Sequence, residues 1–316
     1  MEFDLIDLIR QRTALPRDNV VLGIGDDAAV LEVPEGRQLV ACTDTLVAGV
    51  HFLPATMPED IGWKALAVNL SDLAAMGAEP AWVLLALTLP EPDMQFVERF
   101  AEGFAELARD CKVALVGGDT TQGPLSVTVT ALGSVPAGVA LTRGGARADD
   151  AVFVTGTLGD AAGALQRLRD RKDVPAALLA RLQRPQPRIA AGLTLRRLAS
   201  ACIDVSDGLL ADLGHVCAAS GVGAELDADA LPLSSLLSAT FDAGVCRELA
   251  LSGGDDYELC FTVADARVTE VKDGVARTGC EVTRIGRIVT GSGVRAIDAR
   301  GRDVTPTLAG WEHFSE

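Results

Sequence analysis

Six short stretches of the chain place an aspartate beside glycine or a hydroxyl residue, and most of them follow directly on an apolar run. The stretches are Gly23-Ile24-Gly25-Asp26-Asp27, Thr43-Asp44-Thr45, Ser71-Asp72, Gly117-Gly118-Asp119-Thr120, Asp204-Val205-Ser206-Asp207-Gly208 and Gly253-Gly254-Asp255-Asp256. A single stretch of this kind is more often a turn than a site, because Asp and Gly are both turn formers. Six of them, mostly at the ends of apolar segments, favour one shared site.

Carboxylate oxygens are the ligands that this chain offers in quantity. The aspartates of these stretches suit Mg²⁺, which takes one or two carboxylates together with water and substrate phosphates. Two carboxylates about 4 Å apart repel by roughly 4 kcal/mol at an effective dielectric near 20, and a divalent cation removes that repulsion. No lysine lies in the six stretches, so metal would have to neutralise a bound phosphate. Arg143, beside Gly144-Gly145, is the arginine best placed to hold phosphate through two hydrogen bonds.

Other nucleotide and metal motifs are missing from the sequence. No G-x-x-x-x-G-K-[ST] loop occurs, and no G-x-G-x-x-G joins a strand to a helix. The three histidines are too few and too scattered for a His-rich zinc site. The seven cysteines include no C-x-x-C pair, which favours reduced thiols and a cytoplasmic location.

Charge and hydropathy exclude further classes. A formal net charge of -16 argues against nucleic acid or an anionic membrane as partner. No uncharged apolar stretch reaches 18 residues, so we expect no transmembrane helix. The acidic start, residues 1–4, does not resemble a signal peptide.

The elements that must position the aspartates follow from periodicity. Apolar spacing predicts helices over 3–12, 59–78 and 93–110, and strands over 38–42, 81–89, 113–116, 125–132, 151–154, 202–203 and 257–263. The strand over 38–42 is expected to end at Thr43, and the strand over 113–116 to end at Gly117. The apolar run 81–89 predicts a strand covered on both faces. The phenylalanines of 93–110 are interpreted as core rather than as a stacking platform.

Residues 136–150 are rich in turn formers and predict a boundary between two domains, 1–137 and 138–316. Both halves mix strands and helices, so the expected fold class is α/β or α+β with two domains.

Each carboxylate taken singly could be a turn residue or a helix cap, and Asp160 and Asp212 are interpreted in that way. His51 alone is only a candidate site residue, and Trp311 would ordinarily pack against the core. Asn69 and Asp72 are three residues apart, so they should share one face of the helix over 59–78.

Taken together and in order, these stretches resemble the thiamine-monophosphate kinases, a family within the aminoimidazole-ribonucleotide-synthetase-like ATP enzymes. The resemblance is carried by the stretches above, extended to Thr43–Phe52, Asn69–Gly77, Asp204–Leu209 and Ser252–Leu259, and it runs to Trp311. It implies a subunit of two α/β domains. The N-terminal domain would bind ATP and Mg²⁺ and pair into a homodimer, and the C-terminal domain would complete the active site.

The resemblance also implies a reaction and a set of residues. The γ-phosphoryl group of ATP would pass to the phosphate of thiamine phosphate, giving thiamine diphosphate and ADP. Several Mg²⁺ ions would be held by Asp27, Cys42, Thr43, Asp44, Asp72, Asp119, Asp204 and Asp207. ATP would contact Gly118, Asp119, Arg143 and Ser206. Thiamine phosphate would contact His51, Asp255 and Trp311.

The sequence departs from the family pattern at three positions. Cys42 stands where Ser or Thr is usual, and a thiol is a poor Mg²⁺ ligand. Asp255 stands where Glu is frequent, and Ala101 lies near the place of an ATP-contacting Tyr in some relatives.

Phosphoryl transfer needs positioning and charge neutralisation more than covalent help. The acceptor phosphate is already a nucleophile, so we expect direct in-line transfer without a general base. In that scheme Asp44, Asp72, Asp119 and Asp207 act through Mg²⁺.

Two other interpretations stay open at this point. One is another ATP-using enzyme of the same superfamily, such as the synthetase itself, a selenophosphate synthetase or a hydrogenase-maturation enzyme. The last carries a C-terminal cysteine, whereas this chain ends in residues 313–316 without one. The other is a non-catalytic sensor of Mg²⁺-nucleotide.

Overall fold

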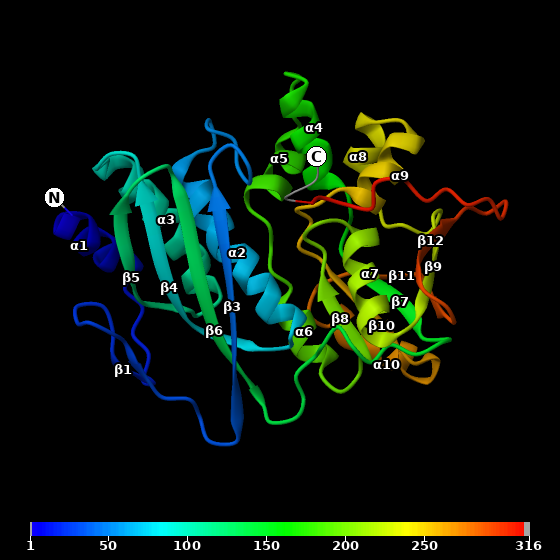
Figure 1. Ribbon diagram of the computed structural model, residues 1–316, viewed down its shortest axis with the longest axis horizontal. Helices are drawn as coiled ribbons and strands as arrows, with labels where there is room; N and C mark the ends of the chain where they lie inside the picture. Colours follow the sequence, from blue (N-terminus) through cyan, green and yellow to red (C-terminus); the bar gives the residue numbers. More distant parts are fainter. Residues whose placement is uncertain (1, 313–316) are drawn as a thin grey trace. The chain divides into compact units, whose positions relative to one another are not determined.

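The computed structural model describes residues 2–312, and the chain divides into two compact units (Figure 1). The first unit is Met1–Leu73 with Ala78–Gly138, and the second is Ala74–Gly77 with Val139–Glu316. Each unit has its own mixed sheet with helices, which confirms the α/β class. Residues 313–316, whose lack of cysteine was used above, lie outside the described residues.

A four-stranded sheet forms the first unit. Its order is β3 (Arg37–Val47), β6 (Ser126–Pro136), β4 (Glu79–Leu89) and β5 (Ala114–Gln122). The pairs are antiparallel except β4 with β5, which is parallel. The helices α2 (Pro58–Ala75) and α3 (Met94–Asp110) lie together on one face of the sheet, while α1 (Glu2–Thr13) packs against α3 and β5 (Figure 1). Two short strands, β1 (Val20–Leu22) and β2 (Val30–Leu31), form a separate ribbon.

Small residues let α2 and α3 approach closely. A Cβ added at Gly62 of α2 would overlap the backbone of Phe100, and one added at Gly103 would overlap the backbone of Glu59. The Asp93 carboxylate caps α3 by accepting from the amides of Gln95 and Phe96, at 2.9 and 3.0 Å. Residues 100 and 104 of α3 are fully buried, so the interpretation of its phenylalanines as core is confirmed.

Three predictions about this sheet were wrong. Strands β3 and β5 do not end at residues 43 and 117 but run through the aspartate stretches to Val47 and Gln122. Every residue of β3 has a partner in β6, so Thr43–Thr45 belong to the ladder. Strand β4 is covered by helices on one face only, because Ala86 is exposed and Leu84 and Thr88 are half-buried.

A six-stranded sheet forms the second unit. Its order is β12 (Gly293–Ile297), β9 (Gly223–Asp227), β11 (Val282–Val289), β7 (Ala151–Thr155), β10 (Leu259–Val263) and β8 (Ala201–Asp204). Only β12 with β9 is parallel. Helix α7 (Leu209–Ser220) contributes to the core on one face, and α6 (Ile189–Leu195) and α10 (Val268–Ala276) contribute on the other. The remaining helices are α4 (Asp160–Arg169), α5 (Ala176–Gln183), α8 (Ser235–Thr240), α9 (Ala243–Ser252) and the short η1 (Asp265–Arg267).

Between residues 2 and 312, no helix combines the length and the apolar character needed to cross a membrane.

Candidate active site

Cys42 and two aspartates lie together in the first unit. The Cys42 thiol faces α2, with Sγ 3.3 Å from the Asn69 carbonyl oxygen. Burial, and then the nearby carboxylates of Asp72 and Asp44, raise the pKa of this thiol. Asn69 and Asp72 therefore approach the same strand residue, as expected of two residues on one helix face. The thiol stays neutral between two carboxylates.

Thr43 points the other way. Successive side chains of a strand alternate between faces, and the Thr43 hydroxyl donates to the Val129 carbonyl oxygen at 3.1 Å and lies 3.0 Å from the Thr130 hydroxyl. Its side chain is on the helix-free face, opposite Cys42 and Asp44. Any share that Thr43 takes in a metal site with Asp44 would therefore come from main-chain oxygen.

His51 lies in the turn after β3, and its tautomer follows from its contacts. The Nδ1 atom accepts a hydrogen bond from the Val47 amide at 3.0 Å, so a neutral imidazole carries its proton on Nε2. The main chain of the turn is closed by Gly49, whose amide donates to the Phe52 carbonyl oxygen at 2.8 Å. The ring thus presents a donor to its surroundings.

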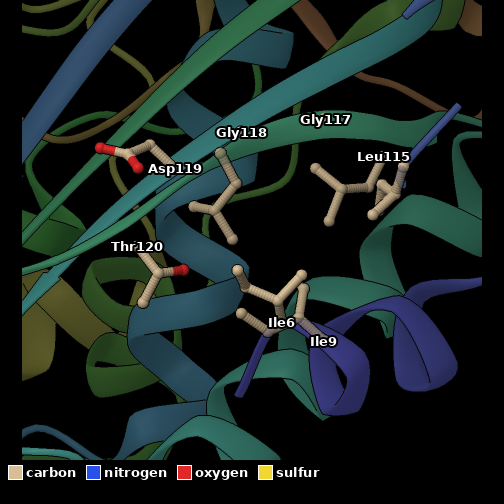
Figure 2. Close-up of a pocket in the computed structure, with 9 residues that line it drawn as sticks. Ile6, Ile9, Leu115, Gly117, Gly118, Asp119 and Thr120 are labelled. Atoms are coloured by element: carbon tan, nitrogen blue, oxygen red, sulfur yellow. The ribbon is translucent and has the colours of Figure 1, made fainter. Parts of the chain in front are cut away.

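Gly118 and Asp119 line a small pocket of about 90 Å³ within the first unit (Figure 2). Ile6 and Ile9 of α1 form its apolar side, and Ile24 brings in the loop that carries Asp27. Gly118 has φ +153°, and a Cβ there would collide with the Leu85 backbone of β4, so only glycine fits. Asp27 itself is exposed, and its amide donates to Asp26 Oδ1 at 2.8 Å.

In the second unit, three segments far apart in sequence meet at the start of α7. The Asp255 amide donates to the Ser206 carbonyl oxygen at 2.8 Å, and the Trp311 amide donates to the Asp207 carbonyl oxygen at 2.9 Å. Gly254 and Gly310 allow these approaches, since a Cβ on either would lie 2.5 Å from the oxygen of Ser206 or Asp207. The structure thus brings together residues predicted for ATP, for metal and for thiamine phosphate.

Asp212 organises the loop before α7. Its Oδ2 atom accepts from the backbone amides of Ser206, Asp207 and Gly208, at 3.0, 3.1 and 3.1 Å. Burial first, and then the charges of Asp204 and Asp207, raise the pKa of Asp212 to about 7. The interpretation of Asp212 as a cap is therefore too narrow, because its carboxylate holds the whole turn.

The segment that carries Arg143 is bonded to the C-terminal end of α7, not to the loop of residues 204–208 before its N-terminal end. Ser220, the last residue of α7, donates from Oγ to the Arg143 carbonyl oxygen at 3.3 Å and accepts from the amides of Gly145 and Ala146 at 3.1 Å. Ser206 precedes the other end of the same helix, which is 12 residues or about 18 Å long. The contact of Arg143 with ATP stays a prediction.

No group of three or more His, Cys, Asp or Glu side chains that could hold a metal ion is formed within residues 2–312. Five of the eight predicted ligands occur in two neighbourhoods instead. Asp44 and Asp72 lie near Cys42 in the first unit, and Asp204 and Asp207 lie near Asp212 in the second. The full metal set remains a prediction.

Two anchoring residues, Asp256 and Glu258, were missed by the sequence interpretation. Both are at most 1% exposed; Asp256 follows Asp255 directly, and Glu258 lies three residues after Asp255 in the chain. The signal that could have found Glu258 is a charged residue directly before the apolar run Leu259–Val263, since a buried charge needs partners.

Comparison with known proteins gives matches over almost the whole chain. The AIR synthase related protein family matches with its N-terminal domain over residues 25–135 and with its C-terminal domain over residues 147–299. A thiamine-monophosphate kinase of Salmonella typhimurium is 47% identical, over 99% of this chain and 98% of its own. The crystal structure of thiamine-monophosphate kinase from Stenotrophomonas maltophilia is 52% identical with a TM-score of 0.88, covering 93% of this chain and 96% of that one. A second similar structure, AaThiL complexed with AMPPCP and TMP, is 36% identical with a TM-score of 0.79, covering 99% of this chain and 97% of that one.

Proposed function

The chain belongs to the thiamine-monophosphate kinases of the AIR synthase related family, and from this premise we propose how its residues carry out the reaction. The γ-phosphoryl group of ATP passes directly to a phosphate oxygen of thiamine phosphate. The bond from the γ-phosphorus to the β–γ bridging oxygen breaks, and ADP and thiamine diphosphate leave. A similar chain that is complexed with AMPPCP and TMP supports this pair of substrates.

The observation that carries the proposal is the meeting of three segments at α7. Asp255 is bonded through its amide to Ser206, and Trp311 through its amide to Asp207. We assign Asp255 and Trp311, with His51, to thiamine phosphate, and Ser206, with Gly118, Asp119 and Arg143, to ATP. Acceptor and donor would then lie on neighbouring backbone segments, as in-line transfer requires.

The donor chemistry of the chain fits Mg²⁺. Mg²⁺ prefers oxygen and usually takes one or two carboxylates, completed by water and substrate phosphates. The pairs Asp44 with Asp72 and Asp204 with Asp207 have this composition, and Asp27 and Asp119 add further carboxylates. When bound, Mg²⁺ would neutralise the charge of the two reacting phosphates. Cys42 does not fit, because its neutral thiol offers a soft sulfur between hard oxygens.

No residue is assigned as general base. The acceptor is an anionic phosphate that needs no deprotonation, and His51 accepts from the Val47 amide through Nδ1, so its neutral ring carries the proton on Nε2. We propose that His51 orients thiamine phosphate by donating to it.

Assembly and location complete the proposal. The helix-free face of the first unit's sheet carries exposed Leu39, Ala41 and Ala86, and half-buried Leu84 and Leu132. A second copy of the chain would cover this apolar face, so we propose a homodimer formed by residues 1–137, with residues 138–316 completing the active site. All seven cysteines are unbridged, which suits the cytoplasm.

A coupled assay for ADP release tests the function. We expect ADP to form only when ATP, Mg²⁺ and thiamine phosphate are all present, together with an equal amount of thiamine diphosphate. ADP release without the acceptor would favour another ATP-using enzyme of the superfamily, and nucleotide binding without turnover would favour a sensor.

The direct transfer is tested separately. After incubation with γ-³²P-ATP and Mg²⁺ but no acceptor, we expect no label on the protein. A stable labelled enzyme would contradict in-line transfer.

A further inference from the structure

The loop that carries Asp255 has an unusual backbone. Asp255 and Tyr257 are both non-glycine residues in the left-handed region, with φ +68° and +51°. This conformation is unfavourable for residues with a Cβ, and it persists only where the surroundings fix it. Something in the second unit must therefore hold residues 255–257 in place.

The side chains of Asp256 and Glu258 are buried in the second unit. Asp256 accepts from the Gly159 amide, with its two oxygens at 2.9 and 3.1 Å. Glu258 accepts from Arg188 through Nε and Nη2 at 2.6 and 2.5 Å, from Arg181 Nη2 at 2.7 Å and from the Thr155 hydroxyl at 2.6 Å. Four donors on one fully buried carboxylate make a rigid anchor.

The donors to Glu258 come from separate elements. Arg181 belongs to α5, Arg188 stands directly before α6, and Thr155 ends β7. Gly156 makes the space, because a Cβ at this residue would collide with the Glu258 carboxylate. The anchor therefore fixes the loop against three parts of the second unit at once.

We propose that Glu258, held by Arg181 and Arg188, is a positioning residue of the reaction. It fixes the 255–257 backbone so that the Asp255 carboxylate stays directed at thiamine phosphate. The Tyr257 hydroxyl completes the arrangement by donating to Asp255 Oδ1 at 3.1 Å. This inference rests on the proposed role of Asp255 in binding thiamine phosphate.

The effect should be confined to the thiamine phosphate side. The amides of residues 206–208 have their own anchor in Asp212, whereas the donors to Glu258 come from Thr155, Arg181 and Arg188. Loss of the Glu258 charge should therefore loosen residues 255–257 while the 206–208 turn stays in place.

The test compares Glu258→Gln with wild type. Glutamine keeps the shape of the side chain but loses the negative charge that forms ion pairs with Arg181 and Arg188. We expect the KM for thiamine phosphate to rise at least tenfold and the KM for ATP to stay within twofold. Asp298→Asn is the matched control, since it changes another arginine-paired carboxylate, after β12 at the opposite edge of the sheet, and should change neither KM.

A double mutant shows whether Glu258 acts through Asp255. In an Asp255→Ala background, Glu258→Gln should raise the KM for thiamine phosphate no further. An equal rise in both KM values, an additive effect in the double mutant, or a loss of thermal stability with unchanged KM would overturn the proposal. If Glu258→Gln does not fold, Arg188→Lys keeps the buried charge but loses one of the two arginine contacts and gives the same test.

Hydrogen exchange makes the result independent of turnover. The amides of Asp255 and Tyr257 should exchange at least tenfold faster in Glu258→Gln, while those of residues 206–208 keep the wild-type rate. Unchanged hydrogen-exchange rates at the amides of Asp255 and Tyr257 would contradict the inference. Absence of ADP release by the wild type would instead count against the function.

Discussion

The two units position their predicted site residues in different ways. In the first unit Cys42, Thr43 and Asp44 lie in the unbroken ladder of β3 with β6, and Asp119 lies in the ladder of β5 with β4, which is regular from Leu84 onward. In the second unit Ser206, Asp207 and Asp255 lie in turns between elements, and buried carboxylates hold these turns. Strand positions depend on many equivalent backbone bonds, whereas each turn depends on one or two buried carboxylates. The second unit should therefore be the more sensitive to single changes away from the substrates.

The largest expected effect should be alike in both units. Asp44→Asn in the first unit and Asp207→Asn in the second each remove the charge of a carboxylate that we propose as a metal ligand, while keeping the shape of the side chain. We expect kcat to fall by about 10²-fold or more in both, because charge stabilisation in the transition state is lost. The melting temperature should change little. Steady-state kinetics with saturating Mg²⁺ measures the first effect, and wild-type turnover in either variant would remove that residue from the metal set.

The second prediction concerns the supporting residues, whose loss should have a larger effect in the second unit than in the first. Asp212→Ala leaves one buried amide, that of Gly208, and two half-buried amides, those of Ser206 and Asp207, without their acceptor. An unsatisfied buried amide costs about 1–3 kcal/mol, and the half-buried ones cost less. We expect a marked loss of thermal stability, fast hydrogen exchange over 206–208 and at least tenfold lower activity. Asp212→Asn, which keeps an acceptor oxygen, should retain most of the stability.

The matching change in the first unit is Thr130→Val, which removes the hydroxyl that pairs with Thr43. The ladder keeps the register of Asp44, so we expect a loss of only about 1 kcal/mol in stability and turnover within twofold of wild type. If Thr130→Val harmed activity as much as Asp212→Ala, the distinction between ladder and anchor would be wrong.

The smallest effect should come from Cys42→Ser. A hydroxyl is a harder ligand than a neutral thiol, so we expect the Mg²⁺ concentration for half-maximal activity to fall by about two- to fivefold. A Mg²⁺ titration at fixed ATP measures it. Cys111→Ser, at the end of α3, serves as the control with no expected change. An increased Mg²⁺ requirement in Cys42→Ser would mean that the thiol itself contributes to binding.

The sequence was sufficient for features that depend on local chemistry. The helix over 93–110 was predicted because its phenylalanines recur on one face, and the structure adds the Asp93 cap. The sequence prediction was wrong at Gly117-Gly118, because two adjacent glycines are typical of a turn. They lie in a strand because Gly118 must pass close to the backbone of Leu85.

For the candidate site, the sequence indicated candidate residues but not the contacts that hold them in place. The face of Thr43 depends on how far β3 continues, which the stretch Thr43-Asp44-Thr45 does not reveal. The partners of Glu258 lie 70 and 77 residues away in the chain, so no local pattern could pair them. Long-range contacts of this kind exist only once the fold has formed.

The position of the Asp212 carboxylate has a consequence for nucleotide recognition. Helix N-termini commonly bind phosphate through their leading amides, but here those of residues 206–208 already donate to a side chain of the same helix. An oxygen of the protein's own side chain thus occupies the place where a polyphosphate tail would otherwise bind. Metal-free ATP and inorganic sulfate should accordingly be poor competitors at this turn.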